Sequence, residues 1–139
     1  SIVTNKRTIS SENFFTGMYE TCLEPHEIIE ELVFPLPKTS AYCKFKNPAS
    51  RYAIVGVMVA EFQSGVRVAV TGAGSSVFRA SKIEDLLNKS FSTTILDETL
   101  IADDDLISDM HASAKYRAHL ITVMAKRAVG KALKSRDVN

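Results

Sequence analysis

The stretch that decides the fold is YAIVGVMVAEFQSGVRVAVT, residues 52–71. Its first half is apolar at successive positions, which is typical of a central strand covered on both faces. Residues 63–65, Gln-Ser-Gly, then form a turn sequence, and valines follow at every second position (Val66, Val68 and Val70). The pattern predicts an antiparallel β-hairpin whose first strand lies in the middle of a sheet.

The segments on either side add one strand, one short extension and two helices. Residues 40–45 alternate in polarity and predict a half-exposed strand, and residues 77–79 predict a short extension. Ser81 is placed to cap a helix from Lys82 to about Asn88. Residues from about 113 to 133 predict a long helix, because small apolar residues recur every three or four positions (Ala114, Ala118, Ile121, Ala125, Ala128 and Ala132).

These elements predict an α+β fold class: a small antiparallel sheet of three to four strands packed against a long C-terminal helix and a shorter helix. The first 20 residues predict an extended start and then a short helix capped near Ser10, with Phe14, Phe15 and Met18 on one side. Residues 27–34 fit a helix or a strand by periodicity. Pro35 favours the extended alternative, because the residue before a proline avoids the helical region.

Composition excludes several classes of protein. The 139 residues are 45% hydrophobic and 24% charged with a net charge of +1, so nothing attracts the whole chain to nucleic acid. The longest apolar run, residues 53–60, is far too short to span a membrane. Two cysteines, Cys22 and Cys43, are too few for a disulfide framework, and the start lacks a secretion signal. We therefore expect a cytoplasmic globular protein.

The sequence shows no catalytic triad, metal-ligand cluster or paired carboxylates. Gly72-x-Gly74 follows a strand as a phosphate-binding loop does, but it lacks a third glycine and a following Lys-Ser or Lys-Thr, which favours a simple turn. The acidic run 103–105 fits a cation ligand set or a solvated loop, and it lacks the glycine and terminal glutamate of a calcium loop. The acidic run and the basic residues of the C-terminal helix also fit a purely structural role, in which they pair with each other.

Tyr42 and Lys44 are the candidate cofactor-binding residues. They share one face of a strand, about 7 Å apart by strand rise. An aromatic ring and a cation on one exposed face suit a flat, electron-rich or anionic ligand, and the alternative is an ordinary solvated face.

Several local patterns, taken in order, resemble one family. They are Arg51-Tyr52-Ala53-Ile54-Val55-Gly56-Val57, Gly72-Ala73-Gly74, Val77-Phe78-Arg79-Ala80, Glu84 with Leu87, Asp109-x-x-Ala112-Ser113-x-x-Tyr116-Arg117 and Lys126-Arg127-Ala128. In this order they resemble the C-terminal domain of the FAD-binding (medium) subunit of molybdenum hydroxylases, of the carbon monoxide dehydrogenase and xanthine dehydrogenase type. Upstream, Arg7-x-Ile9, Phe14-Phe15, Thr21-x-Leu23, Glu27-Ile28-Ile29 and Phe34-Pro35-Leu36-Pro37 resemble the end of that subunit's flavin domain.

The resemblance implies that residues 1–34 are the tail end of a flavin-domain-like segment and linker, and that residues 35–139 are the C-terminal domain. It implies FAD as the cofactor of the full-length subunit, which passes electrons from iron–sulfur clusters to an external acceptor. The glycine-rich phosphate-binding motifs of the flavin domain are missing here, so binding of FAD by this chain alone is not implied.

The implied partners are the N-terminal flavin domain and the iron–sulfur and molybdenum subunits, with neither nucleic acid nor a membrane span. The Tyr42-x-Lys44 strand is the segment we align with the wall beside the isoalloxazine ring, with Tyr42 against the ring and Lys44 at its polar edge. The alternative is a standalone, non-catalytic module of the same fold that serves dimerisation, as a homodimer, or subunit docking.

Overall fold

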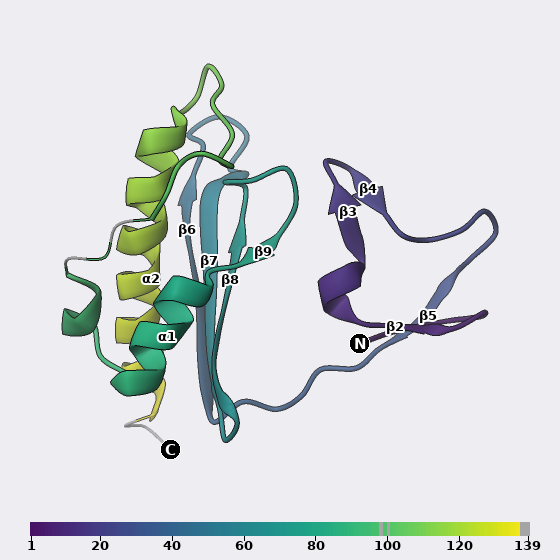
Figure 1. Cartoon of the computed structure of the whole chain (residues 1–139), viewed down its shortest axis with the longest axis horizontal. Coiled ribbons are helices and arrows are strands. Elements are labelled where there is room, and N and C mark those ends of the chain that lie inside the picture. Colours follow the sequence, from purple (N-terminus) through teal and green to yellow (C-terminus); the bar gives the residue numbers. More distant parts are fainter. Residues whose placement is uncertain (98, 100, 137–139) are drawn as a thin grey trace. The chain divides into compact units, whose positions relative to one another are not determined.

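The computed structural model describes residues 1–97, 99 and 101–136. The chain forms two compact units, Ser1–Leu36 and Pro37–Asn139. Figure 1 shows the elements of both, and each unit is described by itself below.

The second unit is built on a four-stranded antiparallel sheet, as predicted. Its strands are β6 (Thr39–Lys46), β7 (Ala53–Phe62), β8 (Gly65–Thr71) and β9 (Phe78–Arg79), in the spatial order β6-β7-β8-β9 (Figure 1). Phe62 pairs with Gly65, so residues 63 and 64 form a two-residue hairpin turn. The backbone φ of Gly65 is 127°, a value that favours glycine at this turn.

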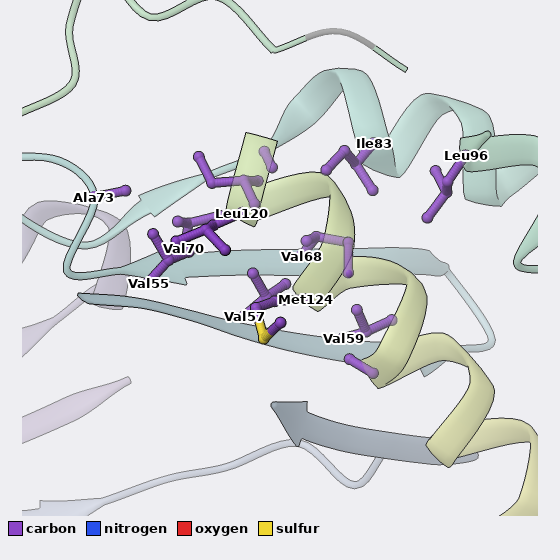
Figure 2. Close-up of a cluster of buried hydrophobic side chains, with 14 of the residues drawn as sticks. Val55, Val57, Val59, Val68, Val70, Ala73, Ile83, Leu96, Leu120 and Met124 are labelled. Carbon is purple, nitrogen blue, oxygen red and sulfur yellow. The ribbon is translucent and has the colours of Figure 1, made fainter. Parts of the chain in front are cut away.

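Two helices, α1 (Ser81–Lys89) and α2 (Ala114–Arg136), pack against the same face of this sheet, and a short 3₁₀ helix, η2 (Thr94–Leu96), lies between them in the chain (Figure 1). The core lies between the helices and the sheet (Figure 2). Its fully buried side chains come from alternate positions of β7 and β8 and from the helices (Val55, Val57, Val59, Val68, Val70, Ile83, Leu87, Leu96, Ile121, Met124 and Val129). The predicted α+β fold class is confirmed.

The residues of β7 are buried on both faces, as predicted, although helices pack on only one of these faces. No helix in the described residues of the second unit packs on the face that carries Tyr42, which pairs with Met58 of β7. Burial on this face comes partly from the sheet's own side chains, because the Tyr42 ring covers Gly56. Small residues such as Gly56 and Ala60 need little cover, so an apolar pattern on both faces arises with helices on only one.

The long C-terminal helix is confirmed, and its start is capped as its sequence suggests. The Ser113 Oγ accepts a hydrogen bond from the Tyr116 N–H at 3.2 Å. Farther along, Thr39 Oγ1 donates to the Ala132 carbonyl at 2.8 Å and ties β6 to α2. Lys126 also pairs at 2.8 Å with Asp97, a residue outside the acidic run 103–105.

The predicted cap of the shorter helix was wrong. Ser81 is the first residue of α1, Ala80 occupies the N-cap position, and no side chain caps the helix. The Ala80 N–H donates to the Val68 carbonyl at 2.9 Å, while its own carbonyl accepts from Ile83 and Glu84. The chain therefore passes directly from pairing with β8 into the helix, and no free residue remains to act as a side-chain cap.

The first unit contains two small sheets. One consists of β1 (Ile2–Thr4), β2 (Thr8–Ile9) and β5 (Ile29–Leu32) in the order β2-β1-β5, and the other is the hairpin β3 (Phe15–Gly17) with β4 (Glu20–Thr21). The extended alternative for residues 27–34 is thus confirmed by β5.

The predicted N-terminal helix is shorter than expected. It is a single 3₁₀ turn, η1 (Ser11–Asn13), capped by Ser10, whose Oγ accepts from the Glu12 N–H. It ends because Phe15 enters β3 and pairs with Thr21. Phe14 is buried, whereas Phe15 and Met18 are exposed, so the three do not form one covered face.

Substitution of Val57 by aspartate tests the core assignment. Val57 is fully buried between β7 and the helices, so Val57→Asp places an unpaired charge in the core and is expected to lower the free energy of unfolding by about 3 kcal/mol or more. Met110→Asp is the control, because Met110 is 92% exposed. Thermal melting of Val57→Asp that coincides with that of the parent would contradict the strand assignment.

Candidate functional site

The candidate site is the sheet face opposite the helices, here called the open face: Tyr42, Lys44, Gly56, Met58, Ala60, Arg67, Ala69, Thr71 and Arg79, which share this face by strand register. Tyr42 is 41% exposed, and its ring lies over Gly56. A Cβ at Gly56 would lie 2.2 Å from the Tyr42 hydroxyl and 2.7 Å from Thr71 Oγ1. Glycine at this position therefore leaves the space that the hydroxyl end of Tyr42 occupies.

Lys44 lies on the same face as Tyr42, as predicted from the alternation. Its Nζ donates to the Arg51 carbonyl at 3.1 Å, across the turn between β6 and β7. Arg51 has a φ of 61°, in the left-handed region. The Lys44 side chain therefore stabilises the turn between β6 and β7, while its charge stays at the surface. Cofactor binding by this pair stays a prediction.

The open face is positively charged. Arg67 lies opposite Ala60 and joins Lys44 on this face, whereas Arg79, opposite Ala69, has its guanidinium paired with the Glu84 carboxylate. The four strands β6–β9 contain one acidic residue, Glu61. It lies on the face that packs against the helices, where its carboxylate pairs with Arg136 at 3.2 Å. A surface with this charge attracts anionic ligands or acidic surfaces.

Glu84 of α1 contacts both β8 and β9 at this edge of the sheet. Its Oε1 accepts from the Val68 N–H at 2.7 Å and from Arg79 Nε, and its Oε2 accepts from Arg79 Nη2 at 2.6 Å. Burial acts to raise the pKa of Glu84, but the hydrogen bonds from Arg79 and Val68 outweigh it, so the pKa lies below its ordinary value. The ionised carboxylate thus holds the Arg79 side chain at the end of β9.

A buried cation, Arg117, joins three segments at the far end of the sheet. Its Nη1 donates to the Ile54 carbonyl at 2.7 Å and to the Gly72 carbonyl at 2.9 Å, and its Nη2 pairs with Asp109 at 2.8 Å. Within the described part of the chain, its Nε is buried without a hydrogen-bond partner. This group was not predicted from the sequence, where Arg117 is one of several basic residues of the C-terminal helix.

The partners of Arg117 are themselves held in place. Asp109 Oδ1 accepts from the N–H groups of His111 and Ala112 at 2.9 and 3.0 Å. These two hydrogen bonds, assisted by Arg117, lower the pKa of Asp109. Gly72 has a φ of 77°, and a Cβ there would lie 2.4 Å from the Ala53 carbonyl oxygen. Only glycine allows this close approach.

The glycine segment and the acidic segment, each a weak sequence candidate, border one surface pocket of about 310 Å³. Gly74, Ser75 and Ser76 line one side, and Asp105 and Leu106 line the other. The Ile107 N–H donates to the Ala73 carbonyl at 2.9 Å and holds the two segments together. Among the described residues, no three His, Cys, Asp or Glu side chains lie close enough together to hold a metal ion.

A second group missed from sequence lies in the first unit. The buried Glu27 carboxylate accepts from Thr4 Oγ1 at 2.8 Å, from Arg7 Nε at 3.0 Å and from the Glu24 N–H at 2.8 Å. The Arg7 hydrogen bond, with those from the Glu24 N–H and Thr4, lowers the pKa of Glu27 to about 2. This group holds β1 and the segment before β5 together.

Fold and site together define a small α+β domain with two helices on one face of its sheet and a partly aromatic open face on the other. Residues 40–132 match the family described as the CO dehydrogenase flavoprotein C-terminal domain. The chain belongs to this family, which confirms the resemblance. Among the described residues, no helix is both long enough and apolar enough to cross a membrane.

Individual relatives agree with this assignment. The chain is 32% identical over 137 residues to the nicotine 6-hydroxylase medium subunit of Paenarthrobacter nicotinovorans, covering 91% of this chain and 48% of that subunit. It is 29% identical to the carbon monoxide dehydrogenase medium chain of Hydrogenophaga pseudoflava, with the same two coverages. The chain thus spans about half the length of the curated relatives it matches.

Solved structures show the same fold. A chain of CO dehydrogenase from Oligotropha carboxidovorans superposes with a TM-score of 0.71 at 25% identity, covering 94% of this chain and 49% of that one. A chain of quinoline 2-oxidoreductase from Pseudomonas putida 86 has a TM-score of 0.73 at 23% identity and the same coverages, which shows likeness of fold alone.

Substitution of Arg117 by methionine is expected to destabilise the second unit by about 3–5 kcal/mol, because it leaves two carbonyls and Asp109 without their buried cation. Arg127→Met, at an exposed position of the same helix, is the matched control and should change stability by less than about 0.5 kcal/mol. Chemical denaturation of both variants measures the difference. Equal stability of the two variants would show that the buried contacts of Arg117 are not a support of the sheet.

The Glu27 group makes the stability of the first unit depend on pH. Because the pKa falls from an ordinary 4.5 to about 2 in the folded chain, its stabilisation is complete above about pH 4.5 and is lost as the pH falls toward 2. An NMR titration of the side-chain carboxyls should give Glu27 a pKa of about 2. In Glu27→Gln, this part of the pH dependence should disappear, whereas Glu30→Gln should retain it. An ordinary Glu27 pKa would rule out the ion pair with Arg7.

Proposed function

We propose that this chain is the C-terminal part of the FAD-binding subunit of a molybdenum hydroxylase. In that subunit it flanks the flavin that passes electrons from iron–sulfur clusters to an external acceptor. The observation that carries the proposal is the family match over residues 40–132, together with matches to about half the length of two medium subunits. The first unit would then be the end of the flavin domain and its linker, residues 1–34.

The open face fits one side of a flavin site. Its Tyr42 side chain is partly exposed beside Gly56, and Lys44 and Arg67 place positive charge on the same face. When bound, FAD supplies the redox chemistry. Tyr42 would contact the isoalloxazine ring and Lys44 would face its polar edge, while Gly56 keeps the Tyr42 ring against the sheet. The glycine-rich phosphate-binding motifs are missing from this sequence, so the rest of the FAD site belongs to the flavin domain.

The proposed partners are the N-terminal flavin domain and the iron–sulfur and molybdenum subunits. The names of the relatives support this reading, because a medium subunit or medium chain is one component of a larger enzyme. We place the protein in the cytoplasm, which suits the two free cysteines, Cys22 and Cys43.

A second candidate function is a docking or dimerisation module of the same fold. The observation that favours it is the set of exposed apolar side chains in the first unit (Ile28, Ile29, Leu32, Val33, Phe34 and Leu36). This surface and the flavin-flanking function are compatible, because a subunit domain needs both a cofactor side and a contact side.

An FAD titration tests the flavin-flanking function. The chain is mixed with a probe, the half of the P. nicotinovorans nicotine 6-hydroxylase medium subunit that it does not match, and flavin absorbance and fluorescence are followed. We expect saturable binding by the mixture. Tyr42→Ala should raise the Kd about threefold to tenfold, as expected for loss of an aromatic stacking contact worth about 0.5–1.5 kcal/mol.

The controls separate the site from the fold. Lys44→Met should also weaken binding, whereas Lys115→Met, on the exposed surface of α2, should leave the Kd unchanged. Absence of flavin binding by an assembled mixture would sink the proposed function. Equal Kd values for Tyr42→Ala, Lys44→Met and the parent would place the flavin elsewhere on the domain.

A further inference from the structure

We propose that helix α1 blocks strand addition at the edge of β8 over residues 65–68, here called the β8 edge. The side chains of Glu84 and Asn88 occupy the main-chain hydrogen-bonding positions that an added strand would use. This inference concerns the association of the chain with itself. It does not depend on flavin binding and so goes beyond the proposed function.

Strand β9 covers only part of the outer side of β8. It is two residues long and pairs with Ala69 and Val70. Val70 pairs with Phe78 of β9, and the Val68 carbonyl accepts from the residue that follows β9. Because successive residues of a strand direct their main-chain groups to alternate sides, those of Val66, Val68 and Val70 all point to this side. The N–H groups of Val66 and Val68 therefore lie beyond the end of β9.

The regular pairing with β8 ends at Ala80, because the chain turns there into α1. The Ala80 N–H donates to the Val68 carbonyl at 2.9 Å, as in a continued strand. The Ala80 carbonyl instead accepts from the N–H groups of Ile83 and Glu84 at 2.9 and 3.0 Å. The Glu84 Oε1 takes the place of that carbonyl and accepts from the Val68 N–H at 2.7 Å. A side chain of the helix thus completes the main-chain pairing of Val68.

Asn88 repeats this arrangement one helical turn later. Its Oδ1 accepts from the Val66 N–H at 2.8 Å. Residues four apart share one side of a helix and lie about 6 Å apart along its axis, and residues two apart in a strand are separated by about 6.6 Å. Helix α1 packs beside β8 (Figure 1). The near equality of the two repeats lets it present one acceptor to Val68 and the next to Val66.

The composition of β8 makes such protection necessary. Its sequence, GVRVAVT, holds three valines and one charged residue, a pattern that favours association with another strand when an edge is open. The strand at the other end of the sheet, β6, is protected differently, since Lys44 and Lys46 place charge at alternate positions. Because β8 has only Arg67 in this role, the acceptor side chains of α1 supply the protection instead.

The strand that the block excludes is β8 of a second copy of this chain. A two-fold axis brings the same surface of two copies together, so two β8 edges would pair antiparallel. With Val66 opposite its equivalent in the second copy, Gly65 of each copy lies opposite Arg67 of the other. No like charges then face each other, and pairing of the two strands is unopposed once the edge is open.

Amide hydrogen exchange of the full 139-residue chain, followed by NMR, tests the role of the acceptors. Asn88→Ala removes one acceptor at an exposed position, and we expect the Val66 amide to exchange about tenfold faster, as for loss of one hydrogen bond. Alanine favours a helix more than asparagine does, so a weakened α1 cannot explain this result. Asn88→Asp keeps an acceptor oxygen and should retain slow exchange. Asp85→Ala, at an exposed position of the same helix, is the matched control and should leave Val66 unchanged.

Sedimentation velocity over a range of concentrations tests the block itself. Glu84→Met/Asn88→Ala lacks both acceptors, and we expect it to form larger assemblies than the parent, with residues 65–68 protected from exchange in the assembly. Glu84→Gln/Asn88→Asp keeps both acceptor oxygens and should have the oligomeric state of the parent. Asn88→Ala alone should shift the chain toward the same assemblies to a smaller extent. Because Asn88 is exposed, this single variant keeps the core intact and decides the question if the double variant does not fold.

Three results would overturn the proposal. Unchanged exchange of Val66 in Asn88→Ala would show that Asn88 does not cover the β8 edge. Folded acceptor-free variants with the oligomeric state of the parent would show that nothing is blocked there. Assemblies in which residues 65–68 stay unprotected would place the association elsewhere on the chain. All of these measurements are made without FAD, so their failure leaves the proposed function standing, and absence of flavin binding leaves this inference standing.

Discussion

The second unit depends on one buried charge. A guanidinium removed from water is costly unless its hydrogen-bonding groups are matched, and Arg117 meets this requirement with two main-chain carbonyls and one carboxylate. The carbonyls come from the start of β7 and the residue after β8, and the carboxylate comes from the loop before α2. The position of the long helix along the sheet is therefore set by polar contacts as well as by the apolar core, which is non-directional.

The one-sided packing of the sheet follows from its small residues. The face toward the helices carries valines, and side chains of α1 and α2 pack on them and bury them (Figure 2). The other face has Gly56 and Ala60 on the central strand, and a single tyrosine ring covers the glycine. A face with so little side-chain volume needs no helix packed on it to be buried.

Sequence reasoning recovered the parts of the molecule that depend on local periodicity. The β7–β8 hairpin, the long helix and the shared face of Tyr42 and Lys44 all follow from alternation or helical spacing. The supporting groups could not be predicted in this way, because their partners are distant in the chain: Arg117 contacts Ile54 and Glu27 contacts Arg7. From sequence alone, a charged residue is expected to be exposed to solvent. The burial of Arg117 follows only from its tertiary partners.

The two units differ in how far they can fold from their own residues. The second has a continuous core between sheet and helices, so its residues 37–136 supply their own apolar contacts. The first relies on the Glu27 hydrogen bonds and on a core of three residues. Hydrogen bonds to a charged group orient segments, but their net contribution to stability is modest compared with that of a buried apolar face.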